Sequence, residues 1–195
     1  MISGMKKFIK ANSFPWTTLA KYWRNSSKSE LIMDIFLPML ISALLLLLTS
    51  RYINDFKGLI GIFQQLSGQV IAAISILAGF NIASITIIAT AGGISDALRN
   101  RRSTPTSLSV YEILIIFFTW AVIVQLIVVL LSVMLFYTGS FVPTEMNVLI
   151  PVWGWCAAWF WMSITLHSIF ISIRNMKTLY LYVTYTPPPP TPPIP

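Results

Sequence analysis

Few side chains in this sequence could carry out catalysis, and they lie far apart. Catalysis by paired acids and bases needs groups that converge on one reacting bond. Most of the carboxylates instead stand near the ends of apolar runs, where they suit helix capping. The chain also contains no nucleotide-binding, serine-hydrolase or zinc-protease motif. We therefore predict no catalytic residue and no enzyme activity for a chain whose acids are Glu30, Asp34, Asp55, Asp96, Glu112 and Glu145.

The residue types that most often bind metals occur singly. His167 is the only histidine, and Cys156 is the only cysteine. A structural zinc site takes four such ligands, and a haem within a helical bundle would be expected to take two. We therefore expect His167 to be a hydrogen-bonded structural residue and Cys156 to fill space. No metal and no cofactor is predicted.

One carboxylate occupies a less ordinary position. Asp34 stands inside the apolar run that begins at Leu31, so it is the acid that could be submerged in lipid. An ionisable residue within a membrane span is a functional candidate by default. The alternative is an ordinary interfacial position close to Lys28. The sequence leaves both interpretations open.

The chain is built mainly for lipid. Of its 195 residues 56% are hydrophobic and only 10% are charged, which does not fit a water-facing surface. Four apolar runs reach the roughly 20 residues that a helix needs to cross a bilayer, and they are too continuous for barrel strands. We predict an all-α polytopic membrane protein whose bundle covers residues 30–174, with spans at about 31–50, 63–93, 110–137 and 148–173.

Basic residues indicate the orientation of these spans. Eleven of the 13 lysines and arginines fall in three alternate segments, and only Arg51 and Lys57 fall on the other side. Because cytoplasmic segments are enriched in Lys and Arg, we predict that both termini are cytoplasmic. This topology, together with contact with anionic membrane lipids, accounts for the net charge of +7, so direct binding of nucleic acid is not expected.

A short amphipathic helix is predicted within the cytoplasmic segment 1–29. Ser13 suits an N-cap and Pro15 suits the first turn. An interfacial helix at the membrane surface fits this pattern best, with its aromatic side chains in the acyl boundary and its basic ones toward the headgroups. The membrane-surface residues would be Trp16, Lys21, Trp23 and Arg24.

Small residues form a stripe along the second span. At about 100° per residue they share one narrow face, and small faces let helices approach closely in lipid. We interpret the stripe as a packing surface, within the subunit or between copies in a homo-oligomer, and alternatively as a pore wall. Asn81 points nearly the opposite way and needs hydrogen-bond partners. The predicted packing residues of the stripe are Gly68, Ala72, Ser75, Gly79, Ala83 and Thr86, and Thr90 and Gly93 continue it.

The tail, residues 175–195, has two patterns. The sequence TLYLYVTYT alternates in the manner of a β-strand, and a proline-rich arm follows it. A lone strand needs a partner, so we predict a docking element for a cytosolic protein, with a passive spacer as the alternative for the arm. The proposed docking residues are Tyr180, Tyr182, Tyr185, Pro187, Pro188, Pro189 and Pro190.

The helix count, chain size, inward termini and central stretch LAGFNIASITIIATAGG resemble the KwaA family, the membrane subunits of bacterial Kiwa anti-phage systems. This resemblance implies an oligomeric bacterial inner-membrane subunit that detects phage attachment or injection and relays it to a DNA-binding effector in the cytosol. The effector would dock on the tail or on a cytoplasmic loop. The alternative is a pore-forming oligomer, either a holin-like or toxin-like protein or an ion channel.

Overall fold

The computed structural model of the chain describes residues 13–91, 99, 101, 108–141 and 148–184. Over these ranges the chain is all-α, and no strand is present. Four helical stretches are long and apolar enough to cross a membrane, at Lys28–Thr49, Phe56–Thr90, Val110–Gly139 and Val152–Val183. The prediction of a multi-pass membrane protein with four spans is therefore confirmed by length and composition.

The first span is composite and the others are single helices. A short helix precedes it, and a π-helical turn interrupts it. The elements are α2 (Phe14–Asn25), α3 (Lys28–Leu31), the π-helix η1 (Ile32–Phe36), α4 (Leu37–Thr49), α5 (Phe56–Thr90), α7 (Val110–Gly139) and α8 (Val152–Val183).

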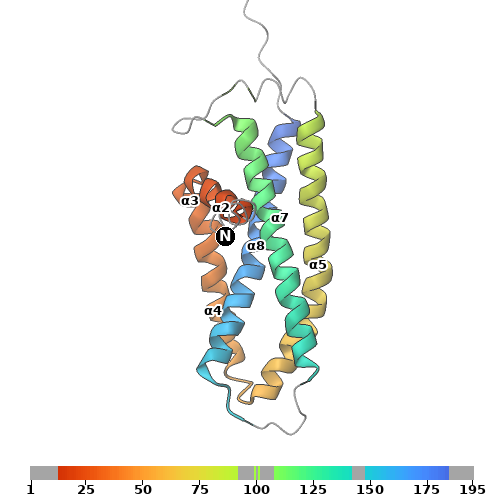
Figure 1. Ribbon diagram of the computed structural model, residues 1–195. Coiled ribbons are helices and arrows are strands. Elements are labelled where there is room, and N and C mark those ends of the chain that lie inside the picture. The colour runs from red at the N-terminus through yellow and green to blue at the C-terminus, as the bar shows by residue number, and fades with distance from the viewer. Residues whose placement is uncertain (1–12, 92–98, 100, 102–107, 142–147, 185–195) are drawn as a thin grey trace, which may run out of the picture.

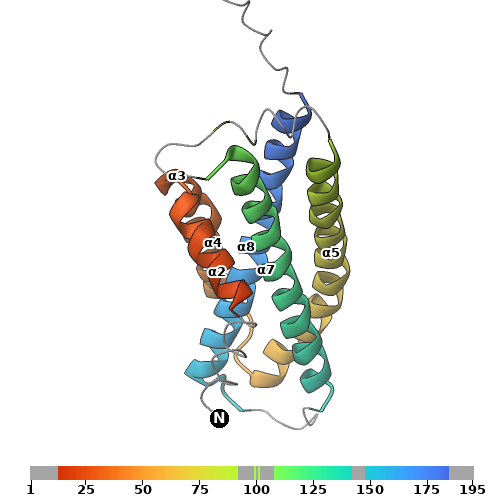
Figure 2. The same ribbon diagram turned by 45° about the horizontal axis from the view of Figure 1, so that its top comes forward.

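The four spans form an elongated bundle (Figure 1). Helix α7 packs along α5, α8 contacts α4, α5 and α7, and α2 lies across the side of the bundle against α7 (Figure 2). The hairpin end is the end where α4 leads to α5 and α7 leads to α8. There the backbone N–H of Phe56 donates to the carbonyl of Val148 at 2.9 Å. The opposite, terminal end carries the start of α7 and the ends of α5 and α8.

Carboxylates set three of the helix starts, as their positions in the sequence predicted. Glu30 and Ser27 form a capping box before α3, and Glu112 and Ser109 form a second one before α7. Asp55 accepts a hydrogen bond from the N–H of Gly58 at 2.7 Å and caps α5. Each cap satisfies donors that a helix N-terminus leaves open. Helix α5 therefore begins at Phe56, seven residues before the predicted start.

The predicted strand in the tail is wrong, because α8 continues as a helix to Val183. Leu179 and Tyr182 are one helical turn apart, and they pack against a cluster that includes Ile88 and Leu114. The Tyr182 hydroxyl also donates to the carbonyl of Ile88 at 3.1 Å. Burial against two neighbouring helices thus outweighs the local β-propensity. Tyr185 and Pro187–Pro190 lie outside the described residues.

Helix α2 confirms the predicted short N-terminal helix. Trp16, Lys21, Trp23 and Arg24 are all exposed, so the predicted membrane-surface residues point away from the bundle. The opposite face buries Tyr22, whose ring centroid lies 5.7 Å from that of Phe117 and 5.7 Å from that of Trp120. Helix α2 therefore packs on α7 through one face, and Trp16 and Trp23 on its other side are exposed outside the bundle.

Candidate functional site: a buried ion pair and an amide network

Asp34 is buried inside the bundle. It lies on the π-helical turn, where the N–H of Leu37 donates to the carbonyl of Ile32 five residues earlier. Only 2% of Asp34 is exposed, so the protein itself shields its carboxylate from solvent. Asp34 is therefore enclosed by neighbouring helices, whichever depth in the membrane it occupies. Turns of this kind inside α-helices occur frequently at functional sites.

Two side chains from other elements converge on the Asp34 carboxylate. Arg174 of α8 forms an ion pair with Asp34 Oδ2. The hydroxyl of Tyr22, on α2, donates to the same oxygen at 2.7 Å. A buried charge needs an opposite charge and hydrogen bonds to offset the loss of water, and this carboxylate has both. The contact joins the first span, α2 and α8 at one point.

His167 binds the backbone of the same residue. Its Nδ1 lies against the carbonyl oxygen of Asp34. In an α-helix this carbonyl would accept from the N–H of residue 38, but residue 38 is proline and has none. A carbonyl only accepts, so Nδ1 must carry the proton. His167 is therefore a hydrogen-bonded structural histidine that fills an acceptor left open by Pro38.

Aromatic rings cover the Arg174 guanidinium. Its central carbon lies 4.5 Å from the centroid of the Phe117 ring and 5.3 Å from that of the Tyr22 ring. Such cation–π contacts are strongest where water is excluded. Arg174 Nε and Nη2 have no hydrogen-bond partner among the described residues, so the ion pair and the rings carry the stabilisation of this charge.

The phenol of Tyr22 acts as a donor over the physiological pH range. Burial raises its pKa above the usual value, and the hydrogen bond to Asp34 acts in the same direction, while the charge of Arg174 opposes it. The phenol thus keeps its proton and its bond to the carboxylate. This contact holds α2 on the bundle by a polar bond as well as by ring packing.

A network of amides and a hydroxyl fills the adjacent core. The Asn81 amide nitrogen donates to Gln125 Oε1 and to Ser172 Oγ, both at 3.1 Å. Gln125 donates to Ser172 Oγ at 2.6 Å, and Asn175 donates to Asn81 Oδ1 at 3.1 Å. All four residues are buried, and they come from α5, α7 and α8. Such bonds across helices fix register in lipid.

The network and the ion pair form one polar layer. Asn175 follows Arg174 directly in α8, and its amide nitrogen also lies 3.4 Å from the carbonyl of Phe117, whose ring covers that arginine. Its oxygen, Asn175 Oδ1, is a buried acceptor with no partner in the part of the chain that the structure describes. Because α8 supplies Ser172, Arg174 and Asn175, a shift of α8 would disturb its contacts with α2, η1, α5 and α7 together.

Helix lengths place this layer about one membrane thickness from the hairpin end. Arg174 lies 22 residues after the start of α8, and Phe117 lies 22 residues before the end of α7. At 1.5 Å per residue both stretches measure about 33 Å, close to the roughly 30 Å of a hydrocarbon core. If the hairpin end lies at one membrane surface, the ion pair lies near the other.

The predicted packing stripe on α5 is turned outward. Gly68, Ala72, Ser75, Gly79, Ala83 and Thr86 are all exposed. A Cβ added at Gly79 would meet no atom within 4 Å, and one at Gly68 would meet only the Phe136 ring at 3.9 Å. Among the residues that the structure describes, the stripe is therefore not a packing surface between helices of one subunit. Asn81 lies on the opposite, inward face.

The predicted docking residues are divided by the fold. Tyr180 is 67% exposed, whereas Tyr182 is 4% exposed and belongs to the core. The expectation that Cys156 fills space in the core is wrong, because Cys156 is exposed on α8. His167, Asp34 and the other described residues form no cluster that could hold a metal ion.

Most of this site was not predicted from the sequence. Asp34, Asn81 and His167 were predicted as separate features, and Arg174 was counted only among the eleven cytoplasmic basic residues. Tyr22, Ser172 and Asn175 were not singled out. One signal was available, since a submerged acid needs a cation and Arg174 directly follows the last predicted apolar run.

Comparison of the chain with protein-family models, with curated proteins and with solved structures found no match. The fold and site therefore define the class by themselves. The chain is a multi-pass, all-α membrane protein with a buried ion pair and an amide network between its spans.

Proposed function

We propose that this protein is a non-enzymatic sensor and scaffold subunit of the bacterial inner membrane, with both termini in the cytoplasm. It assembles with copies of itself and relays a membrane event to a cytosolic effector. The observation that carries the proposal is the contact of Asp34 with Arg174 and Tyr22, which couples the first span and α2 to α8. A change in span packing is thereby transmitted to the terminal end of α8.

The end of α8 supports a role in partner binding. From Ile173 to the end of α8, exposed apolar side chains recur at helical spacing along one face, at Ile173, Met176, Tyr180 and Val183. With the ion pair near the inner membrane surface, this face projects toward the cytoplasm. An apolar face in water calls for a protein partner. The effector would contact this face and the tail that follows it.

Affinity capture tests the relay. Tagged full-length protein, expressed in its host with its neighbouring genes intact, should retain one cytosolic protein after detergent extraction. Deleting residues 185–195 spares Tyr182 and the core, and Tyr180→Asp places a charge in the docking face. Both changes should release the partner, whereas the control Leu181→Asp, which is exposed at 57% on another face of the same helix end, should leave capture unchanged. Retention of the partner by both α8 variants would refute this docking site.

The exposed stripe on α5 supports self-association. It offers small side chains and no steric barrier over several turns, which is how membrane helices approach one another. The copies would meet along α5, on the face opposite Asn81. This arrangement leaves the ion pair inside each subunit free to respond to packing between subunits.

A role in antiviral defence follows from the resemblance to Kiwa membrane subunits. The event detected would be phage attachment or injection, and the effector would be a DNA-binding protein. Co-expression of the chain with its neighbouring gene should lower phage plating, and Arg174→Gln should restore it at equal protein levels. Unchanged plating by the wild-type pair would remove the defence proposal and leave the relay to be judged by capture.

A pore-forming oligomer is the second candidate. The exposed stripe carries the hydroxyls of Ser75 and Thr86, so several copies of α5 could surround a partly polar path. Purified protein in liposomes would then conduct ions, and Ser75→Leu would block the current. The relay proposal instead predicts no conductance and no toxicity on expression alone.

A further inference from the structure

Buried polar atoms without a hydrogen-bond partner gather around the ion pair. Among the described residues such atoms occur on six side chains, and four of these are Asn25, Trp120, Arg174 and Asn175. The large majority of buried polar groups in folded proteins have a partner in the protein or in ordered water. A concentration of exceptions at one place therefore indicates a bound molecule there.

These four residues surround one junction of α2, α7 and α8. The Trp120 ring centroid lies 5.7 Å from that of Tyr22, and the guanidinium carbon of Arg174 lies 5.3 Å from the same Tyr22 centroid. Asn25 follows Tyr22 by three residues, so the two share a side of α2. Asn175 follows Arg174 directly in α8 and is 0% exposed. The unpartnered atoms thus come from three helices at the level of the ion pair.

Both donors and acceptors are left open at this junction. Arg174 Nε and Nη2 and Trp120 Nε1 only donate, whereas Asn25 Oδ1 and Asn175 Oδ1 only accept. A ligand must therefore donate and accept at once. The charge of Arg174 is already balanced by Asp34, so neither an anion nor a cation is called for. Water fits, because a buried water molecule typically makes about three hydrogen bonds to otherwise unsatisfied polar groups.

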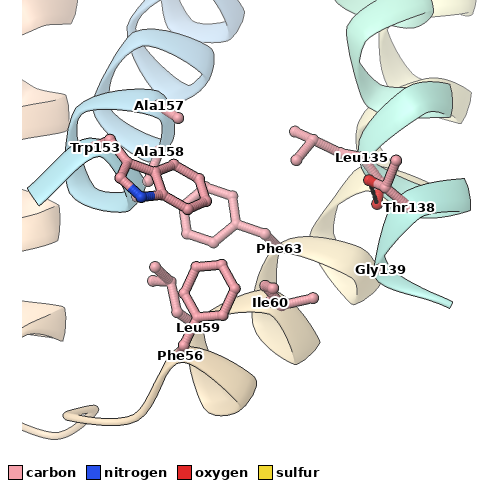
Figure 3. A pocket seen from close by; sticks show the side chains of 11 residues that line it. Phe56, Leu59, Ile60, Phe63, Leu135, Thr138, Gly139, Trp153, Ala157 and Ala158 are labelled. Carbon is pink, nitrogen blue, oxygen red and sulfur yellow. Dashed lines mark hydrogen bonds between the residues drawn. The ribbon is translucent and has the colours of Figure 1, made fainter. Parts of the chain in front are cut away.

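An apolar hollow elsewhere in the bundle provides the contrast. It lies between α5, α7 and α8 at the hairpin end and is lined by residues that include Phe56, Phe63 and Leu135 (Figure 3). The Thr138 hydroxyl, which also lines it, donates to the carbonyl of Met134 at 2.8 Å. No described lining residue carries an unpartnered buried polar atom, and an apolar cavity of this kind stays dry. Water is therefore expected at the ion pair and not at the hairpin end.

We propose that ordered water occupies the junction of α2, α7 and α8 and completes the hydrogen bonds of Arg174, Trp120, Asn25 and Asn175. Helix α2 covers this water, since Tyr22 is 0% exposed. The water solvates the edge of the guanidinium that the ion pair leaves open, which lowers the cost of burying the two charges. A solvated charge changes partners more easily than a dry one, so the hydrated junction is the part of the bundle best suited to rearrange. The inference concerns the ion pair of the proposed relay but does not depend on the relay, because hydration is a property of the isolated subunit.

X-ray footprinting of the full-length protein in nanodiscs tests the site. Irradiation splits bound water into hydroxyl radicals, which oxidise the side chains beside it even where bulk solvent has no access. Phe117 is 7% exposed, its ring centroid lies 4.5 Å from the Arg174 guanidinium carbon, and it should be oxidised. Phe63, 5% exposed and lining the dry hollow, and Phe118, 0% exposed, should stay unmodified. Absence of oxidation at Phe117, or equal oxidation of Phe117 and Phe63, would overturn the site.

A scavenger of radicals in the bulk solvent separates bound water from leakage into the bundle. The scavenger should suppress oxidation of Trp16, which is 73% exposed on α2, and should leave oxidation of Phe117 unchanged. Equal suppression at the two positions would show that the radicals come from outside, and would exclude the bound water.

Two variants test which groups hold the water. Asn25→Leu and Asn175→Leu each replace one unpartnered oxygen by apolar atoms in a side chain of similar size, so each should lower the oxidation of Phe117. A change that merely loosened the packing would raise it instead. Ser42→Ala removes a buried, unpartnered hydroxyl on α4, about two helical turns beyond Asp34, and should leave the oxidation of Phe117 unchanged. Unchanged oxidation in both asparagine variants would refute the assignment. None of these measurements needs an effector, so a dry junction and a failed relay give different results.

Discussion

At the residue scale, the account depends on a single carboxylate. Asp34 contacts an arginine of α8 and a phenol of α2 through its carboxylate, and a histidine of α8 through its carbonyl. The acid could be recognised from the sequence, because it interrupts an apolar run. Its partners could not, because Tyr22 and Arg174 are 12 and 140 residues away and sequence spacing does not report tertiary contact.

Removing either charge should destabilise the protein strongly. Asp34→Asn leaves the guanidinium buried without its counter-ion, and Arg174→Gln does the same to the carboxylate. We expect each change to cost about 3–5 kcal/mol, and the double variant to cost clearly less than their sum. Denaturation of the four variants in detergent measures the coupling. Additive effects would show that the two side chains do not interact.

The docking of α2 should weaken in alkali. Burial raises the pKa of Tyr22 in the folded state, so the folded state holds this proton more tightly than the unfolded state. Its contribution is complete below the unfolded pKa of about 10 and falls as the pH rises above that value. Ultraviolet titration of the wild type against Tyr22→Phe isolates the transition. Ionisation of Tyr22 near the usual tyrosine pKa of about 10 would contradict the burial of its hydroxyl against Asp34.

At the element scale, hydrophobic run length predicted the spans and local propensity failed at their ends. The core of each span was recognisable because nothing but a bilayer accommodates such runs. Helix α8 extends ten residues beyond its predicted end because Leu179 and Tyr182 pack on α5 and α7. Alternation in TLYLYVTYT carried no information about those contacts. The π-helical turn at Ile32–Phe36 was likewise invisible, although Pro38 marked the place.

The amide network should fix helix register more than it adds stability. Asn81→Leu keeps the size of the side chain and removes its bonds to Gln125, Ser172 and Asn175. We expect a loss of about 1 kcal/mol, smaller than that of the ion-pair variants. Thermal unfolding gives the stability, and hydrogen exchange near Gln125 reports loosened packing. A loss of stability as large as that of Asp34→Asn would show that the amide network stabilises the fold as strongly as the ion pair does.

At the scale of the whole molecule, self-association through the α5 stripe and the orientation of the protein in the membrane remain predictions. The stripe on α5 faces outward, so its function depends on a second copy rather than on the subunit's own core. The orientation depends on the distribution of lysine and arginine. The residue types in the sequence could indicate the outward stripe and the orientation, because both concern contacts between the bundle and its surroundings.

Bulk on the stripe should break the assembly without unfolding the subunit. Gly79→Ile fills a position where no neighbouring atom lies within 4 Å, so the isolated bundle tolerates it. We expect the mass measured by light scattering in detergent to fall to that of the monomer. Ala73→Ile, which is exposed but lies off the stripe, is the matched control. An unchanged mass for Gly79→Ile would exclude α5 as the interface.

Cysteine labelling tests the orientation. In a Cys156→Ser background, Tyr52→Cys places a thiol in the exposed loop at the hairpin end, and Thr184→Cys places one at the end of α8. A maleimide that cannot cross membranes should label position 52 in intact cells and position 184 only after permeabilisation. The reverse pattern would invert the protein and place the ion pair at the outer surface.

The coupling between α2 and α8 through Asp34 is tested most directly by a distance measured between the two helices. Spin labels at Ala20→Cys and Lys177→Cys, in the Cys156→Ser background, both lie on exposed positions. The wild-type ion pair should give one narrow distance distribution, and Asp34→Asn should broaden it toward longer distances as α2 leaves the bundle. A distribution that is the same with and without the carboxylate would contradict the account.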